Sequence, residues 1–330
     1  MLKAVAVSPA KVILFGEHFV VGGNTAISMT IDLPTVVTAE PFEGDHIQIR
    51  SEDLGVEAVF SPGGQLSYSS GANAEATLRP IFEAASFILR KIERSGRGLK
   101  LAVKSQVPIG MGLGSSAATA VGTVSAITTL LGSPLSKEEV FASAYSLEKM
   151  VHGQPSGVDQ ATLTYGGLIS YTKGKVDSTL QEIEPPFLII GNTGKRRSTG
   201  EFVGRVTKLR ETQPEKYGRI ASEAQKISDS AMAALINGEV EALGALMNEN
   251  QRLLELVGVS SPELERLISA AKSAGAFGAK LTGGGGGGCM IAVVGEATHA
   301  GVSRSIQQAG GQVLPSQFVP HGVQTSLQKD

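Results

Sequence analysis

Three polar residues interrupt an apolar stretch near the N-terminus, where their side chains could do chemistry. Lys11, Glu17 and His18 lie in the sequence SPAKVILFGEH, whose other residues mostly favour burial. A lysine is rarely buried unless a carboxylate or a phosphate pairs with it. Asp159, in the sequence HGQPSGVDQAT, is a candidate partner for Lys11. The alternative is a lysine at a strand edge with its ammonium in solvent, and an ordinary turn aspartate.

A glycine-rich turn between a predicted strand and a predicted helix has the composition of a phosphate-binding loop. It reads PIGMGLGSSAAT (108–119), with three alternating glycines before Ser115 and Ser116. Glycines let the backbone approach a ligand, and the N–H groups and dipole of a helix N-terminus attract an anion. The turn is neither a Walker A sequence nor a Rossmann fingerprint, because Ser115 stands where the third Rossmann glycine is required. We expect nucleotide binding of another type; the alternative is a tight turn without a ligand.

A run of six glycines, Gly283–Gly288, follows the apolar sequence FGAKLT and precedes the strand-like CMIAVV. Glycine-rich runs are often flexible linkers. This one joins two segments that resemble paired core strands, and ordering six glycines carries a large entropy penalty. We therefore expect a rigid turn that brings the backbone close to a ligand or to another segment.

Two further segments carry charges that suit an anionic ligand. Glu148 lies near the end of a predicted helix, where it is either a metal ligand or part of a solvated helix face. The sequence NTGKRRST (192–199) combines three cations with hydroxyl groups. Such a cluster suits an anionic substrate or a phosphate, although a basic solvated loop has the same composition.

Composition excludes several classes of function. The 330 residues include 29 Lys+Arg and 31 Asp+Glu, a net charge of −2, which gives no electrostatic attraction for nucleic acid or an anionic membrane. The single cysteine, Cys289, excludes an intramolecular disulfide and indicates a reducing compartment. Lys11 and Glu17 interrupt the N-terminal apolar run before it resembles a signal peptide. We expect a cytoplasmic protein that binds neither nucleic acid nor membrane.

Hydrophobic periodicity predicts a mixed chain with strands concentrated in the first half and helices in the second. Strands are expected at 3–8, 11–15, 26–31, 35–39, 46–50, 57–60, 98–104, 167–171, 187–191, 289–294 and 311–318. Helices are expected at 75–94, 115–131, 136–152, 200–211, 214–236, 239–257, 262–274 and 297–308, and the polar tail 321–330 is expected to be loose. The charged segment 172–186 ends in two prolines and predicts a boundary between domains at 1–184 and 185–330.

The three motifs SPAKVILFGEH, PIGMGLGSSAA and KLTGGGGGGC, in this order, resemble those of the GHMP kinases. The sequences EKMVHGQPSGVDQAT, NTGKRRST and LGALMNENQRLL indicate the mevalonate branch of that family. The resemblance covers residues 3–318. It implies an α+β fold of two domains, an N-terminal domain like the second domain of ribosomal protein S5 and a ferredoxin-like C-terminal domain. The active site would lie in the cleft between them.

Matching the motifs residue by residue implies the roles of individual side chains. Asp159 and Lys11 would be catalytic, and Mg²⁺ would be held by Ser116 and Glu148. The substrate would be bound by Lys11, Glu17, His18, Asp159 and Thr199. ATP would be bound by Pro108, Gly110, Gly112, Leu113, Gly114, Ser115, Ser116 and Ala117, and the phosphate loop would be supported by Gly283, Gly284, Gly285 and Gly286.

The implied activity is Mg·ATP-dependent phosphorylation of the 5-hydroxyl of (R)-mevalonate in isoprenoid biosynthesis, by a homodimer. Two departures from the family pattern bear on it. The sequence GGNTA (22–26) replaces the Tyr-Gly-x-Pro-Ala of many relatives, and Lys195 and Arg196 replace an apolar residue and a proline. The extra cations keep a kinase of phosphomevalonate as a rival hypothesis. A catalytically silent member of the family is disfavoured, because Lys11, Glu148 and Asp159 are all present.

Overall fold

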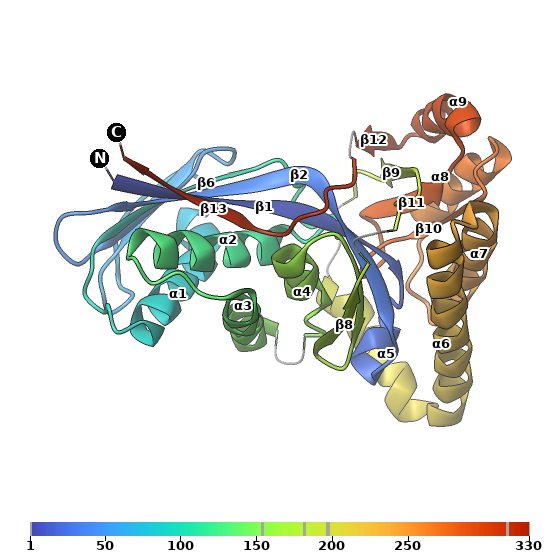
Figure 1. Ribbon diagram of the computed structural model, residues 1–330, viewed down its shortest axis with the longest axis horizontal. Coiled ribbons are helices and arrows are strands. Elements are labelled where there is room, and N and C mark those ends of the chain that lie inside the picture. The colour runs from blue at the N-terminus through green and yellow to red at the C-terminus, as the bar shows by residue number, and fades with distance from the viewer. Residues whose placement is uncertain (1, 153–154, 181–182, 196–198, 315–316, 330) are drawn as a thin grey trace.

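Two sheets, each backed by helices, are built from the two halves of the chain (Figure 1). The computed structural model describes residues 2–152, 155–180, 183–195, 199–314 and 317–329, with only the backbone described at 151, 152 and 199. The α+β architecture of two domains expected from the sequence is confirmed.

The first sheet is organised around two long antiparallel strands, β1 (Leu2–Phe15) and β2 (Ala26–Pro41). Each of them replaces two shorter strands in our prediction. In β1 the pairing with β2 shifts register between Ser8 and Ala10, so Pro9 is accommodated at an irregularity. A proline is tolerated in a strand at such a bulge, which explains why the strand continues through it.

The rest of the sheet adds strands on both sides of this pair. Its order is β13-β1-β2-β6-β3-β4-β5, with β7 on the other part of β2 and β8 beyond it. Among the strands of the described residues, β3 and β6 pair in parallel and the other neighbours pair antiparallel. The bounds are β3 (Ile47–Ser51), β4 (Val56–Phe60), β5 (Leu66–Ser70), β6 (Leu99–Ser105), β7 (Leu168–Thr172), β8 (Lys175–Thr179) and β13 (Gln324–Lys329).

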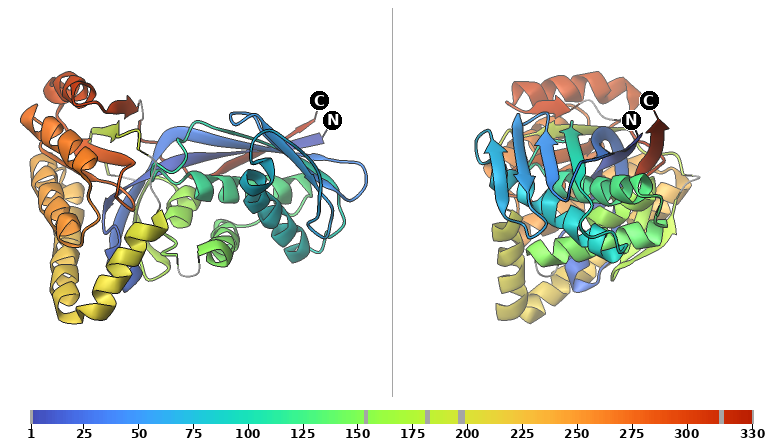
Figure 2. Two further views of the ribbon diagram at one scale, coloured as in Figure 1. Left: turned by 180° about the vertical axis from the view of Figure 1, so that it is seen from behind. Right: turned by 90° about the vertical axis from the view of Figure 1, so that its left-hand side faces the viewer.

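Four helices lie on one side of this sheet (Figures 1 and 2). They are α1 (Ala74–Lys91), α2 (Ser115–Leu130), α3 (Lys137–His152) and α4 (Val158–Tyr165). A capping box begins α3, since Ser136 N–H donates to Glu139 Oε2 at 2.9 Å and Glu139 N–H donates to Ser136 Oγ at 3.3 Å. Helix α2 packs directly against β1 and β2, which places its N-terminus beside these strands.

The second sheet has the antiparallel order β10-β11-β9-β12. Its strands are β9 (Leu188–Asn192), β10 (Gly278–Leu281), β11 (Cys289–Val293) and β12 (Gln312–Leu314). The helices of this half are α5 (Thr199–Thr212), α6 (Pro214–Asn237), α7 (Val240–Leu256), α8 (Pro262–Ser273) and α9 (Glu296–Gln308). Helices α7 and α8 pack against β10, and α6 packs along α7.

The last strand, β13, corrects our prediction of a loose tail. Gln324–Lys329 pair antiparallel with β1, from Leu2 opposite Lys329 to Val7 opposite Gln324. All six side chains are exposed, so the polar composition reflects an edge strand held by backbone hydrogen bonds rather than by burial. The boundary near 184 stays a prediction, and the chain returns to the first sheet after the second is complete.

One hydrophobic core joins the two halves. Leu14 and Phe15 of β1 and Ile27 of β2 belong to the same buried cluster as Leu281 and Ile291 of the second sheet. The ends of β1 and β2 therefore lie against the second sheet, at the junction where the sequence motifs meet. Across the described residues, no helix combines the length and apolarity that a membrane span requires.

Candidate active site

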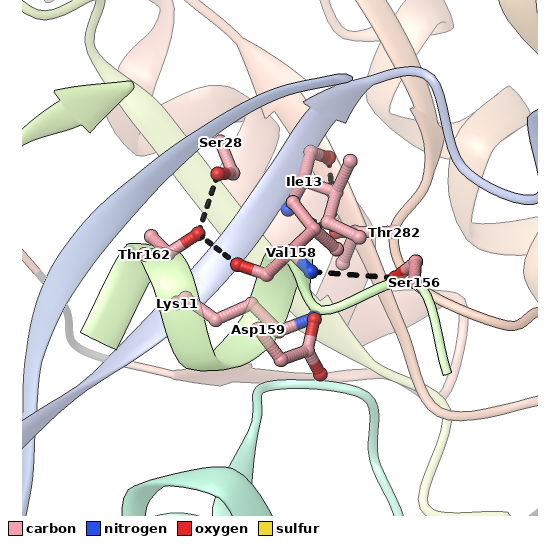
Figure 3. Close-up of polar contacts among 8 residues, drawn as sticks. All are labelled: Lys11, Ile13, Ser28, Ser156, Val158, Asp159, Thr162 and Thr282. Atoms are coloured by element: carbon pink, nitrogen blue, oxygen red, sulfur yellow. Dashed lines mark hydrogen bonds and ion pairs between the residues drawn. The ribbon is translucent and has the colours of Figure 1, made fainter. Parts of the chain in front are cut away.

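Lys11 and Asp159 form an ion pair at the centre of this junction (Figure 3). Lys11 Nζ lies 2.7 Å from Asp159 Oδ1, and the Lys11 side chain is 2% exposed whereas that of Asp159 is 36% exposed. The expected pairing of these residues is confirmed. A buried ammonium thus points at a carboxylate that solvent or a substrate can still reach.

A short helix that our sequence analysis missed carries Asp159 in its first turn. Helix α4 was interpreted as a turn because Pro155 and Gly157 precede it. Gly157 has φ +85°, and a Cβ there would lie 2.4 Å from the Tyr171 hydroxyl oxygen. That hydroxyl donates to the Ser156 carbonyl at 2.7 Å, so the turn is fixed against β7.

The same helix is attached to β2 through hydroxyl groups. Thr162 Oγ1 donates to the Val158 carbonyl at 2.6 Å and lies 2.6 Å from Ser28 Oγ (Figure 3). These buried contacts fix the orientation of α4 relative to the central strands. The position of Asp159 therefore follows from packing on both sides of its helix.

The loop 108–114, which our sequence analysis predicts to be a phosphate loop, packs against Lys11. Lys11 N–H donates to the Leu113 carbonyl at 3.0 Å. Gly114 has φ +85°, and a Cβ there would lie 3.0 Å from Lys11 Cγ and 3.2 Å from Lys11 Cε. Glycine at 114 thus permits both the backbone conformation and the passage of the lysine side chain beneath the loop.

Helix α2 begins at the end of this loop without a side-chain cap. Gly114 is the N-cap residue, and the first turn, which contains Ser115 and Ser116, has no acidic residue. The N–H groups of a first helical turn lack partners within the helix and attract anions. The arrangement fits a bound phosphate and agrees with the expectation for this loop.

The six glycines form a rigid turn between the paired strands β10 and β11, as predicted. A Cβ at Gly285 would lie 2.0 Å from the Val259 carbonyl oxygen, and one at Gly286 would lie 1.9 Å from the Phe202 ring. A side chain at either position would force these neighbours to move. The run is therefore a packed turn and not a linker.

The glycine turn contacts the phosphate loop at the C-terminal end of the turn, where it joins β11. Cys289 N–H donates to the Met111 carbonyl at 3.2 Å, and a Cβ at Gly288 would lie 2.7 Å from that same oxygen. Support of the phosphate loop was expected from Gly283–Gly286. The contacts with Met111 instead come from Gly288 and Cys289.

A second, fully buried ion pair crosses between the halves of the molecule and was missed by our sequence analysis. Lys280 Nζ of β10 donates to Glu17 Oε1, and both side chains are 0% exposed. Lys280 Nζ also donates to the Leu281 carbonyl at 2.7 Å. The signal was available, because Lys280 lies within an apolar strand just as Lys11 does.

Burial dominates the electrostatics of this pair. Loss of hydration raises the pKa of Glu17 above its ordinary value, while the Lys280 ammonium and, more weakly, the Lys11 ammonium oppose the rise. Loss of hydration lowers the pKa of Lys280, and Glu17 opposes that fall. Among the described residues, Glu17 Oε2 is buried without a hydrogen-bond partner.

Thr282 joins β1 to the glycine turn beside the ion pairs. Its Oγ1 accepts a hydrogen bond from Ile13 N–H at 2.9 Å and donates to the Ile13 carbonyl at 3.0 Å (Figure 3). Both bonds are buried and connect residues of the two halves. The Thr282 hydroxyl thus links the second sheet to the backbone of β1.

The remaining expected site residues lie around this centre. His18 follows Glu17 with φ +62° and lines a small cavity of about 10 Å³ together with Tyr217 of α6. This space holds about one water molecule and no substrate. Thr199 is the first residue of α5, and its side chain lies outside the described residues.

Glu148 and Ser116 offer the oxygen donors that suit Mg²⁺. Ser116 is exposed in the first turn of α2, and Glu148 lies partly buried in the last turn of α3, a helix that packs against α2. Mg²⁺ favours one or two carboxylate or hydroxyl ligands supplemented by substrate phosphate and water. In the described part of the chain, no three His, Cys, Asp or Glu side chains form a cluster suited to a metal.

The basic segment is only partly described. Lys195 pairs with Glu263 in the first turn of α8, and its side chain is 63% exposed. Arg196 and Arg197 lie outside the described residues. Lys195 is thus engaged within the protein, which weakens the argument that it binds a substrate phosphate.

Comparison with known proteins agrees with this geometry. The family model described as GHMP kinases N terminal domain matches residues 79–167, and that described as GHMP kinases C terminal matches residues 231–312. The mevalonate kinase of Pyrococcus furiosus is 38% identical, with 98% of each chain covered, and that of Aeropyrum pernix is 34% identical, with 96% covered.

Solved structures show the same similarity in three dimensions. The crystal structure of Methanococcus jannaschii mevalonate kinase matches with a TM-score of 0.82 and 28% identity, covering 96% of this chain and 98% of the other. The L. major mevalonate kinase in complex with R-mevalonate matches with a TM-score of 0.78 and 29% identity, covering 96% of each chain. The chain therefore belongs to the GHMP kinases, and the mevalonate kinases are members that it resembles over nearly its whole length.

Proposed function

We propose that this protein transfers the γ-phosphoryl group of ATP to the 5-hydroxyl of (R)-mevalonate, giving 5-phosphomevalonate and ADP. The observation that carries the proposal is the Lys11–Asp159 pair, held at 2.7 Å beneath the N-terminus of α2. One carboxylate and one ammonium are thereby brought to the point where a phosphate bound at α2 would meet an acceptor hydroxyl. The relatives named above supply the identity of the acceptor.

In this proposal Asp159 orients the acceptor hydroxyl and accepts its proton. The hydroxyl oxygen forms a bond to the γ-phosphorus, and the bond from that phosphorus to the β–γ bridging oxygen breaks as ADP leaves. Lys11 stabilises the charge that develops on the attacking oxygen and on the transferring group. Positioning and charge neutralisation provide most of the rate in such a reaction.

The nucleotide and its metal would be held by the first turn of α2. Its N–H groups and the loop 108–114 would bind the phosphates, and Ser116 and Glu148 would provide oxygen ligands for Mg²⁺. The ion would neutralise phosphate charge. Glu17 and His18 would contact the acceptor.

The proposal also covers the pathway, the cellular compartment and the oligomeric state. We place the reaction in isoprenoid biosynthesis, in the cytoplasm, carried out by a homodimer. These three statements rest on the resemblance to the family.

A substrate panel tests the function. ADP release by the purified protein with Mg·ATP is measured with mevalonate, 5-phosphomevalonate, galactose and homoserine, and phosphorus NMR identifies the product. Selective turnover of mevalonate to the 5-phosphate is expected. Preference for 5-phosphomevalonate would refute the proposed acceptor and assign Arg196 or Arg197 to a substrate phosphate.

Variants of the central pair test the mechanism. Asp159→Asn and Lys11→Met should each lower kcat by about 10²–10⁴ while the fold persists. Asp177→Asn, at an exposed position of β8, makes the same chemical change away from the site and should leave kcat unaltered. Near-normal turnover by either site variant would refute the assigned roles.

A further inference from the structure

The loop that contains Glu17 and His18 packs against helix α6, which belongs to the other half of the molecule. Residues Phe19–Gly22 form a 3₁₀ turn directly after His18. The Phe19 ring lies 6.3 Å from the Tyr217 ring, centroid to centroid, and a Cβ at Gly22 would lie 3.0 Å from the Tyr217 hydroxyl oxygen. An aromatic side chain of α6 thus packs against both ends of the turn.

Hydrogen bonds extend this contact along the same face of α6. Asn24 Nδ2 donates to the Ala221 carbonyl at 2.7 Å. Gln225 makes two bonds to one residue, since its Oε1 accepts from Thr25 N–H at 2.9 Å and its Nε2 donates to Thr25 Oγ1 at 3.0 Å. Tyr217, Ala221 and Gln225 are spaced four residues apart, so they lie on one side of the helix.

Thr25 closes the loop that contains Glu17 and His18. Gly16, at the start of this loop, has φ +90°, and a Cβ there would lie 2.4 Å from the Thr25 carbonyl oxygen. Within the loop, Val20 N–H donates to the Gly16 carbonyl at 3.0 Å and Asn24 N–H donates to the Phe19 carbonyl at 3.3 Å. A displacement of Thr25 would therefore be transmitted to Glu17 and His18, which lie between Gly16 and Phe19.

These contacts occupy the segment that departs from the pattern of many relatives. The sequence GGNTA contains neither a tyrosine nor a proline, and its two glycines add conformational freedom. The structure instead shows Tyr217 packed on Gly22 and Gln225 bonded to Thr25. Rigidity that a proline would give from within the loop is here provided from α6.

We propose that Gln225 is a positioning residue for the acceptor alcohol. It acts indirectly, because its two hydrogen bonds hold Thr25 and Thr25 fixes the loop that contains Glu17 and His18. This inference rests on the proposed function, since it assumes that this loop faces the acceptor. The phosphate loop is held separately, through Cys289 N–H and the Met111 carbonyl. Loss of Gln225 should therefore affect binding of the acceptor and not of ATP.

Steady-state kinetics of four variants test this. Gln225→Leu removes both bonds to Thr25 at similar side-chain volume and should raise the KM for the acceptor about tenfold, with the KM for ATP changed less than about twofold. Glu223→Gln is the matched control on the same helix, because Glu223 pairs with the exposed Arg252 of α7 and, within the described residues, makes no hydrogen bond or ion pair with the loop. The control should match wild type.

Exchanging the amide and the carboxylate between positions 225 and 229 provides a rescue experiment for the acceptor KM. Gln225 Nε2 also donates to Asp229 Oδ1 at 2.7 Å. Gln225→Glu keeps the acceptor for Thr25 N–H but places a carboxylate beside Asp229, so it should raise the acceptor KM. The double variant Gln225→Glu/Asp229→Asn lets an amide donate to the new carboxylate and should recover most of the loss.

The outcomes separate positioning from simple stabilisation. A fall in thermal stability with an unchanged acceptor KM, or equal increases in both KM values, would overturn the proposal. If the wild-type protein prefers another alcohol of the panel, the proposed function fails, and the same KM comparison with that alcohol still decides the role of Gln225. A wild-type protein that uses none of the four alcohols would refute both.

Discussion

Removal of the Lys280 ammonium is the most demanding test of how the site is held together. In the variant Lys280→Met, Glu17 stays fully buried without its cation. Breaking a buried ion pair at one partner typically costs about 3–5 kcal/mol, against about 5–15 kcal/mol for the whole free energy of unfolding. We expect a loss of this size at pH 8, measured by urea denaturation.

The loss should depend on pH with a defined sign. Burial already raises the pKa of Glu17 above its ordinary 4.5, and loss of Lys280 removes the main influence that lowers it. The folded variant then retains a proton at pH values where the unfolded chain releases it. The contribution of Glu17 to the stability of the variant is therefore greatest below about pH 4.5 and falls as the pH rises through the folded pKa of Glu17. The defect relative to wild type should thus be smaller at pH 5 than at pH 8.

Two further variants complete the experiment. Arg252→Met breaks the exposed pair with Glu223 and should cost at most about 1 kcal/mol without this pH dependence. Glu17→Gln/Lys280→Met removes both buried charges and should regain most of the stability while remaining inactive, because Glu17 is proposed to contact substrate. A loss in Lys280→Met no larger than that in Arg252→Met, or one independent of pH, would refute the reasoning.

Three other changes test separate parts of the site. Thr282→Val removes both bonds to Ile13 and should lower the free energy of unfolding by about 1–3 kcal/mol in urea denaturation, whereas an unchanged midpoint would contradict the role of this hydroxyl. Gly286→Ala forces a methyl group into the Phe202 ring, and a thermal melt should show a lower midpoint, with wild-type stability as the contrary result. Chelation of divalent ions should abolish ADP release and added Mg²⁺ should restore it, while full activity in the chelator would argue against the proposed role of Ser116 and Glu148.

The parts of the site that the sequence could predict are those with strong local signals. Alternating glycines before a helix, and a lysine in an apolar strand, indicate a phosphate loop and a buried cation from local chemistry alone. The pairing of Lys11 with Asp159 was foreseen because a buried ammonium needs a carboxylate. The same argument applies to Lys280, which also lies in an apolar strand and pairs with Glu17, although our prediction assigned no partner to it.

Other features depend on contacts that no local pattern records. Helix α4 is short and begins after a proline and a glycine, so its conformation is decided by Tyr171 and Ser28 from distant strands. Strand β13 has no apolar alternation, because its place depends on the free edge of β1. The bonds of Gln225 join residues 200 positions apart in the chain. Such long-range contacts become visible only in the folded molecule.

The return of β13 to the first sheet has a consequence for how the protein is made. During synthesis β1 emerges first, whereas its neighbour Gln324–Lys329 leaves the ribosome only after the whole second half has been translated. Until then one edge of β1 has unpaired backbone groups that could recruit a strand of another nascent chain. This edge of the sheet therefore closes only after the second half of the molecule has been made, and the interval before it closes is when a chaperone would be of most use.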